Sequence, residues 1–229
     1  MRWSASSLVR HCAHRNVLSK LRPRPARTVA AADKGTLFHA AVERWIRSGE
    51  VPEVEDPEVQ GWLDMLAVDW TPHPRAAVEI ALGVSPERKF VEVEEPRPHD
   101  YVPTDHKTPL LTAGRADVVW TEGDVVVVRD WKTGVWPVAP AAENLQVLAL
   151  AFAAADLTWA RAFRAEIYYV RDGYCDSSGE VALGTPEAEA CWAIVEEAAL
   201  LDETPRPGPW CGGCWERRGC AHAATTEAA

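Results

Sequence analysis

Residues 125–134 (Val-Val-Val-Val-Arg-Asp-Trp-Lys-Thr-Gly) most constrain what the chain can fold into, because they join an apolar strand to a pair of opposite charges. The four valines predict a buried strand. Side chains on a strand alternate between its two faces, so Asp130 and Lys132 are expected on one face and Trp131 on the other. A carboxylate and an ammonium exposed together at the end of an apolar strand are costly unless they have a function. The segment therefore predicts a site that holds a divalent metal and positions a water molecule for attack.

The composition is that of a soluble globular protein, with 229 residues, 47% of them hydrophobic and 25% charged. A chain of this length can bury one good core. No apolar run approaches the ~20 residues that span a bilayer, and the N-terminus lacks the continuous apolar segment of a secretory signal. We therefore expect a cytoplasmic protein with no membrane partner.

Basic residues gather at the N-terminus of a chain whose net charge is -10. Residues 1–32 contain seven basic residues and no acidic one, and Arg10, Arg15, Lys20 and Arg22 are among them. Such a segment can neutralise phosphates while the rest of the chain stays acidic. We expect these four residues to contact nucleic acid, and the alternative is a solvated basic arm.

The order of the predicted elements indicates one α/β domain with a mixed sheet. The four prolines of residues 95–109 predict a loop, and residues 122–124 (Glu-Gly-Asp) predict the turn of a hairpin. We expect helices at about 4–18, 33–48, 57–70, 140–156 and 186–202, and strands at about 76–84, 89–94, 111–120, 125–131, 165–170 and 180–183.

Three further polar residues could complete the predicted metal site. Asp117 lies on the strand before residues 125–131 and would approach Asp130 if the two strands pair in a suitable register. Mg²⁺ and Mn²⁺ favour carboxylate oxygens and water, and His39 would add an imidazole. Gln146 interrupts an apolar helix and needs polar partners if it is buried. If there is no metal site, the carboxylates would face solvent, His39 would be an ordinary half-buried residue and Gln146 would bond to the backbone of the core. In the metal site, Lys132 would bind a phosphate or help to activate the water.

Three cysteines crowd the C-terminus with the spacing C-x₂-C-x₅-C. They are Cys211, Cys214 and Cys220, and Cys12 is the candidate for a fourth ligand. Four thiolates suit tetrahedral zinc or an iron–sulfur cluster, and the spacing alone does not choose between them. Either centre would join the two ends of the chain.

Taken together, these motifs resemble the RecB-like branch of the PD-(D/E)XK nuclease superfamily. The resemblance is greatest to its iron–sulfur members, the CRISPR-associated exonucleases and the AddB-type nuclease domains. The similar segments, in chain order, are 4–8 with Cys12, 35–39 (Gly-Thr-Leu-Phe-His), 114–117 (Gly-Arg-Ala-Asp), 130–134, 144–146 (Asn-Leu-Gln) and the C-terminal cysteines. The glutamine motif of the family usually has a tyrosine four residues on, where this chain has Leu150. That difference puts part of the expected DNA contact in doubt.

The resemblance implies a restriction-endonuclease-like fold, in which a mixed central sheet is flanked by helices and an iron–sulfur cluster joins the termini. It implies a basic segment at 1–32 that carries the first cluster ligand, a nuclease core at 33–204 and a cysteine segment at 205–222. The resemblance also favours a 4Fe-4S cluster over zinc, with Cys12, Cys211, Cys214 and Cys220 as its ligands.

The same resemblance implies Mg²⁺- or Mn²⁺-dependent hydrolysis of DNA. His39, Asp117, Asp130 and the backbone carbonyl of Trp131 would hold the metal. Lys132 would assist the nucleophile, and Gln146 would orient Lys132 or the substrate.

We expect an exonuclease that prefers single-stranded DNA and acts in recombination, repair or phage DNA processing, alone or with a helicase. Trp210 and Trp215 would stack on the bases of such a strand. One alternative is a CRISPR spacer-processing nuclease that acts in a complex with an integrase. The other is a catalytically silent DNA-binding adaptor with the same fold.

Overall fold

The strand predicted at residues 125–131 is β6 (Val125–Lys132), and it lies inside a seven-stranded sheet. The computed structural model describes residues 26–201 except 98 and 135–137, together with Ala5, Leu8, Thr204 and Cys220, and it describes side chains of the first helix from Asp33 onward. Of the helix predicted at 4–18, only Ala5 and Leu8 are among the described residues. Among the described helices, none combines the length and the apolarity needed to cross a bilayer.

The sheet has the strand order β2-β1-β5-β6-β7-β8, and β9 pairs with β7. The pair β6–β7 is parallel and the other pairs are antiparallel. The remaining strands are β1 (Ala77–Val84), β2 (Phe90–Val91), β3 (Val93–Arg97), β4 (Asp100–Pro103), β5 (Thr112–Glu122), β7 (Ala162–Tyr169), β8 (Tyr174–Ser177) and β9 (Val181–Ala182). The helices are α2 (Ala26–Ser48), α3 (Pro57–Asp69), α4 (Leu145–Thr158) and α5 (Pro186–Leu200), and η2 (Ala141–Glu143) is a short 3₁₀ turn.

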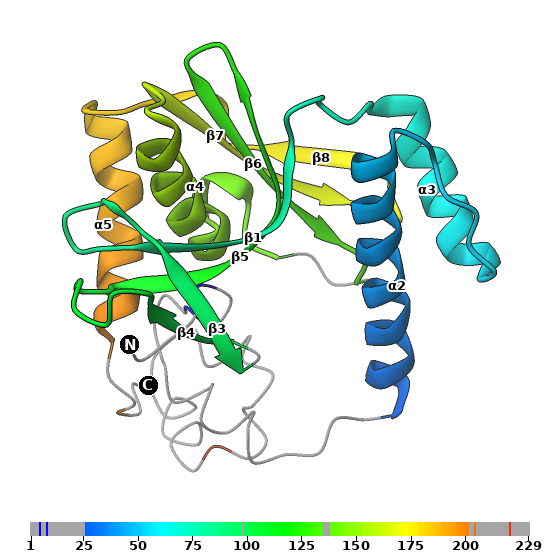
Figure 1. Ribbon diagram of the computed structural model, residues 1–229, viewed down its shortest axis with the longest axis horizontal. Coiled ribbons are helices and arrows are strands. Elements are labelled where there is room, and N and C mark those ends of the chain that lie inside the picture. Colours follow the sequence, from blue (N-terminus) through cyan, green and yellow to red (C-terminus); the bar gives the residue numbers. More distant parts are fainter. Residues whose placement is uncertain are drawn as a thin grey trace, which may run out of the picture.

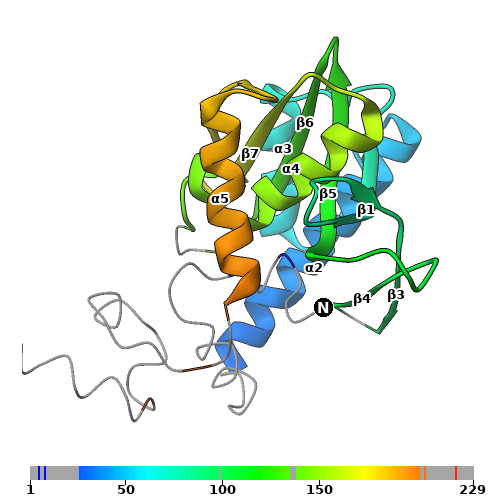
Figure 2. The ribbon, with the colours of Figure 1, turned by 90° about the vertical axis from the view of Figure 1, so that its left-hand side faces the viewer.

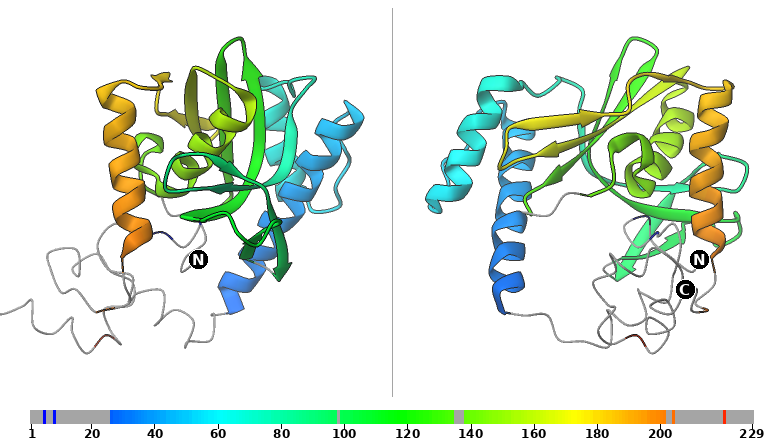
Figure 3. Two further views of the ribbon diagram at one scale, coloured as in Figure 1. Left: turned by 60° about the vertical axis from the view of Figure 1, so that its left-hand side comes forward. Right: turned by 180° about the vertical axis from the view of Figure 1, so that it is seen from behind.

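Helices cover both faces of the sheet, with α4 and α5 on one side and α2 and α3 on the other (Figures 1 and 3). The alternation along β6 matches this layering, because Val126 and Val128 belong to the core under α4 and α5, and Val127 and Trp131 belong to the core under α2 and α3. Figure 2 shows α5 lying in front of α4 on its side of the sheet. The predicted mixed sheet with flanking helices is confirmed.

The hairpin of β5 and β6 sets the register on which the site depends. Its turn is Gly123-Asp124, with Gly123 at φ +62°, a left-handed conformation that glycine adopts without steric cost. Glu122 pairs with Val125 and the ladder continues to Val118 and Arg129. The next residues along the two strands are Asp117 and Asp130, so the hairpin predicted from residues 122–124 brings the two acids together.

Helix α4 begins later than the sequence predicts. Residues 141–143 form η2, and α4 starts only after Asn144, whose side chain accepts hydrogen bonds from the backbone N–H groups of Gln146 and Val147 at 3.1 and 3.2 Å. This is the contact of an N-cap residue. Ten of the eleven positions 145–155 are apolar and buried, and Gln146 is the exception, as expected for a helix enclosed between a sheet and α5.

Two other predicted elements are corrected, and one strand is added. Helix α2 begins at Ala26 rather than near 33, since alanine-rich residues extend it backwards. The predicted loop at 95–109 contains the hairpin of β3 and β4, where each strand has one unpaired edge that tolerates proline. Strand β8 was not predicted, because four residues reading Tyr-Cys-Asp-Ser give little alternation.

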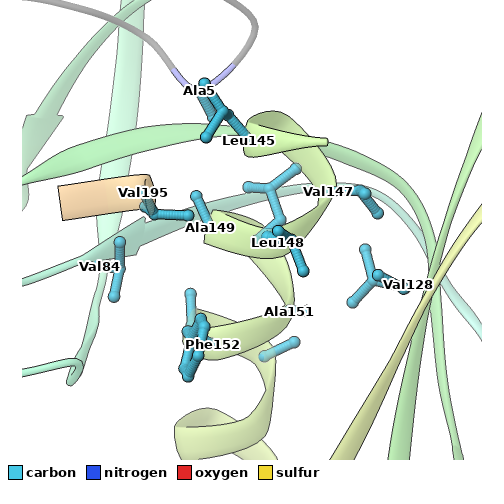
Figure 4. Packing of buried hydrophobic residues seen from close by; sticks show 14 of the residues in the cluster. Ala5, Val84, Val128, Leu145, Val147, Leu148, Ala149, Ala151, Phe152 and Val195 are labelled. Atoms are coloured by element: carbon cyan, nitrogen blue, oxygen red, sulfur yellow. The ribbon is translucent and has the colours of Figure 1, made fainter. Parts of the chain in front are cut away.

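Ala5 and Leu8, near the N-terminus, belong to the core under α4 and α5. Ala5 is 1% exposed, and a Cβ built on Gly114 of β5 would lie 2.9 Å from the Ala5 Cβ. Figure 4 shows Ala5 at the end of α4 where Leu145 lies. Leu8 and Leu201 belong to the same core, so residues near both ends of the chain help to fill it.

Candidate metal centre

An imidazole and two carboxylates converge beside the point where the β5–β6 ladder ends. His39 Nδ1 lies 3.5 Å from Glu79 Oε1 and 3.5 Å from Asp117 Oδ1. One ligand atom from each of these residues lies within 4.8 Å of the other two. Their side chains are between 11% and 28% exposed, so the group is sheltered and still open to an ion. The arrangement could hold one divalent cation.

Glu79 was not among the residues that the sequence singled out. It lies in β1 between Val78, which pairs with Val118, and Ile80, which pairs with Ala116, and its φ is +51°. A non-glycine residue in this left-handed region costs on the order of 1–3 kcal/mol. The available signal was a single acid within the apolar strand predicted at 76–84, the same kind of interruption that marked Gln146.

Asp130 and Lys132 lie on one face of β6, as predicted, and form an ion pair with 2.6 Å between Lys132 Nζ and Asp130 Oδ2. Asp130 is buried and Lys132 is half-buried, so the ammonium keeps an open side. Trp131 points to the other core, where its ring lies edge-on to Phe38 with 6.2 Å between centroids. Its backbone N–H donates to Asp117 Oδ2 at 2.7 Å and orients that carboxylate, while the ligand role of its carbonyl stays a prediction.

A glycine in α2 allows the helix to lie close to the end of β6. A Cβ on Gly35 would lie only 2.8 Å from Thr133 Oγ1, so the absence of a side chain lets the helix approach the turn that follows Lys132. Phe38 is fully buried next to Trp131 and fixes the face of the helix. His39, one turn after Gly35, is thereby directed to the carboxylates.

A network of ion pairs fixes the same turn from the outside. Arg171 donates to the Thr133 carbonyl at 2.7 Å and to Glu58 Oε1 at 2.7 Å. Glu58 also pairs with Lys34 of α2 at 2.6 Å. These contacts join α2, the start of α3 and the turn that follows Lys132.

The electrostatics of the group favour a bound cation. Burial lowers the pKa of His39, but Glu79, Asp117 and Asp130 together raise it to about 9. Burial and the neighbouring Asp130 raise the pKa of Asp117 to about 7. His39 is therefore protonated and Asp117 partly protonated at neutral pH, and a divalent ion would take the place of these protons. Carboxylate oxygens with one imidazole suit Mg²⁺ or Mn²⁺.

Burial also disfavours the charged form of Lys132, but Asp130 outweighs it and holds the pKa of Lys132 above its usual range. The side chain is therefore an ammonium at neutral pH. A protonated Lys132 can bind a phosphate but cannot accept a proton from water.

Gln146 lies at the start of α4. Its side chain is half-buried at the second position of α4 and makes no hydrogen bond to another described residue, and its predicted role toward Lys132 stays a prediction. Leu150 is 2% exposed, and its Cδ2 lies 3.5 Å from where a Cβ on Gly114 would be. The position that usually carries tyrosine therefore lies in the core.

Most residues of the predicted cluster and DNA-binding segment lie outside the described part of the chain. Cys220 is half-buried and forms no disulfide with a described residue. The predicted residues that fall outside are Cys12, Cys211, Cys214, Arg10, Arg15, Lys20, Arg22, Trp210 and Trp215.

The model of the PD-(D/E)XK nuclease superfamily matches residues 2–221. Because the match spans almost the whole chain, the chain belongs to this superfamily. A search of curated proteins finds no match. The mixed sheet and the His39–Glu79–Asp117 group agree with a nuclease fold that binds metal.

Proposed function

We propose that the chain is a nuclease that hydrolyses DNA phosphodiesters with Mg²⁺ or Mn²⁺ bound by His39, Glu79, Asp117 and Asp130. The convergence of His39, Glu79 and Asp117 beside the end of β6, where Asp130 pairs with Lys132, carries the proposal. The bound ion would polarise a phosphoryl oxygen and lower the pKa of a water molecule.

The residues of the chain contribute position and charge. The Lys132 ammonium, 26% exposed, binds a non-bridging oxygen of the scissile phosphate and stabilises the charge that develops there. Asp130 holds Lys132 in place through their ion pair. The Trp131 N–H holds Asp117 in the orientation in which its other oxygen faces His39.

The test is a DNA cleavage assay with and without Mg²⁺ or Mn²⁺. Asp117→Asn and Lys132→Ala are each expected to lower the rate by about 1,000-fold, which corresponds to about 4 kcal/mol. Asp124→Asn, at the exposed tip of the β5–β6 turn, is the matched control and should keep the parent rate. The proposal is wrong if the Asp117 and Lys132 variants both cleave DNA like the parent.

The finer proposal is an exonuclease that prefers single-stranded DNA in recombination, repair or phage DNA processing, alone or with a helicase. It rests on the motif resemblance described above. A closed circular single strand would resist such an enzyme, and a linear one labelled at either end would show the polarity of digestion. Activity that requires an added integrase would favour the CRISPR alternative, and DNA binding without cleavage would favour the adaptor.

We further propose a 4Fe-4S cluster on Cys12, Cys211, Cys214 and Cys220, with the nuclease core at 33–204 between the two cysteine-bearing ends. Its support is that Leu8, shortly before Cys12, and Leu201, at the end of α5, belong to the same core. The visible spectrum and the iron and sulfide content of anaerobically purified protein test it. A colourless protein that contains zinc would overturn the cluster and leave the nuclease proposal intact.

A further inference from the structure

Two tyrosines continue the row of side chains that begins with Lys132. In the parallel pair β6–β7, Lys132 is in register with Tyr169, and in the antiparallel pair β7–β8, Tyr169 is in register with Tyr174. Residues in register on neighbouring strands project from the same face of a sheet. Strands lie about 4.8 Å apart, so Tyr174 is about 10 Å from Lys132 across the sheet.

The two rings are stacked, with 6.1 Å between centroids and an interplanar angle of 19°. The other ring pairs among the described residues are tilted or edge-on, at 55–82°. Those pairs fill the interior, whereas Tyr174 is 57% exposed. Tyr169 is half-buried and packs on the core under α4. Tyr169 therefore supports a flat aromatic surface that faces solvent on the Lys132 side of the sheet.

We propose that Tyr174, backed by Tyr169, is a stacking platform for an unpaired nucleobase of the strand whose scissile phosphate lies at Lys132. The inference rests on the proposed nuclease function and specifies its substrate. Stacked nucleotides rise about 3.4 Å each along one strand, so the base on Tyr174 lies within about three nucleotides of the cleaved bond. A base inside a duplex has both faces covered by its neighbours, and the platform therefore selects single-stranded DNA or a frayed end.

The tyrosine pair also stabilises the contact between β7 and β8, as aromatic pairs across strands do. The two roles respond differently to substitution. Tyr174→Phe keeps the ring for both roles, and Tyr174→Leu keeps an apolar contact across the strands but presents no aromatic face to a base. Thermal unfolding of each variant reports the structural role, and binding of a nucleobase reports the platform.

The experiment measures binding of a fluorescent single-stranded oligonucleotide to the full chain without added divalent ion. Stacking of one base on an aromatic side chain predicts about 5- to 150-fold weaker binding for Tyr174→Leu. Tyr174→Phe should bind like the parent. Trp159→Ala is the matched control, because Trp159 is 92% exposed at the C-terminal end of α4 and should not contact the strand.

An abasic site moved along the oligonucleotide locates the base without a change in the protein. The parent should lose affinity at one position within about three nucleotides of the cleaved bond, and Tyr174→Leu should be insensitive to the same lesion. Equal binding by the parent and Tyr174→Leu, or equal sensitivity to the lesion, overturns the platform. If the parent neither binds nor cleaves DNA, the proposed nuclease function fails, and the platform fails with it.

Discussion

Replacing Gly114 by alanine should displace the N-terminal segment from the core. A Cβ at residue 114 would lie 2.9 Å from the Ala5 Cβ and 3.7 Å from the Ala5 backbone N. Carbon atoms pack at about 3.5–4.0 Å, so the two methyl groups would overlap by roughly 0.6 Å or more. Ala5 is 1% exposed and cannot retreat without losing its burial.

Forcing an extra methyl group into a packed core costs about 1–3 kcal/mol. In a chain of this length, 2 kcal/mol corresponds to a fall in Tm of about 4–8 °C. Guanidinium denaturation should therefore show a lower midpoint for Gly114→Ala, and the slope should fall as well if the N-terminal segment is released in the folded state.

A double variant separates the overlap from other effects. Ala5→Gly removes the methyl group that the new Cβ meets, so Ala5→Gly/Gly114→Ala should be more stable than the sum of the single changes predicts. Gly61→Ala is the control, since nothing lies within 4 Å of its Cβ and alanine favours the helix α3 by about 1 kcal/mol. Parent-like stability of Gly114→Ala, or strict additivity of the pair, would refute the close contact with Ala5.

Three further outcomes follow from the metal centre and from the buried ion pair between Arg129 of β6 and Glu166 of β7. Mn²⁺ affinity, measured by titration calorimetry, should rise from pH 6 to 9, because Asp117 (pKa about 7) and His39 (pKa about 9) must release protons to bind the ion; a flat profile would contradict this. Glu79→Gln should weaken Mn²⁺ binding at least about tenfold, since even the loss of a residue that only hydrogen-bonds a metal ligand has that effect. The denaturation midpoint should not fall. Arg129→Met should lower the free energy of unfolding by about 3 kcal/mol in guanidinium denaturation, because it leaves one Glu166 oxygen without its buried partner at 2.7 Å. Unchanged stability would show that the ion pair with Arg164 alone is sufficient for Glu166.

The sequence predicts best where the signals are local. Four valines before Asp130 and the turn at residues 122–124 each specify their own conformation within a few residues. Strand β6 and the hairpin are found where expected, and the helix predicted at 186–202 is α5. Helix α2 also ends just before Gly49, which adopts φ +80°.

The missed features depend on partners distant in sequence. Glu79 has a left-handed backbone and lies between two residues that pair with β5, and no pattern in residues 76–84 encodes that conformation. The pairing of Tyr174 with Tyr169 requires β8, which is too short to show alternation and exists through its ladder with β7. The approach of Asp117 to Asp130 was expected on condition of a suitable register, and the β5–β6 ladder supplies that register.

The left-handed conformation of Glu79 has a consequence for evolution and engineering of this chain. Glycine and asparagine adopt φ +51° more readily than glutamate, so selection for heat resistance alone should favour them at position 79. Such variants would lose a carboxylate that faces His39. We therefore expect library members that survive heating to carry glycine or asparagine at position 79 and to bind Mn²⁺ weakly, while selection for cleavage should retain glutamate in spite of its backbone strain.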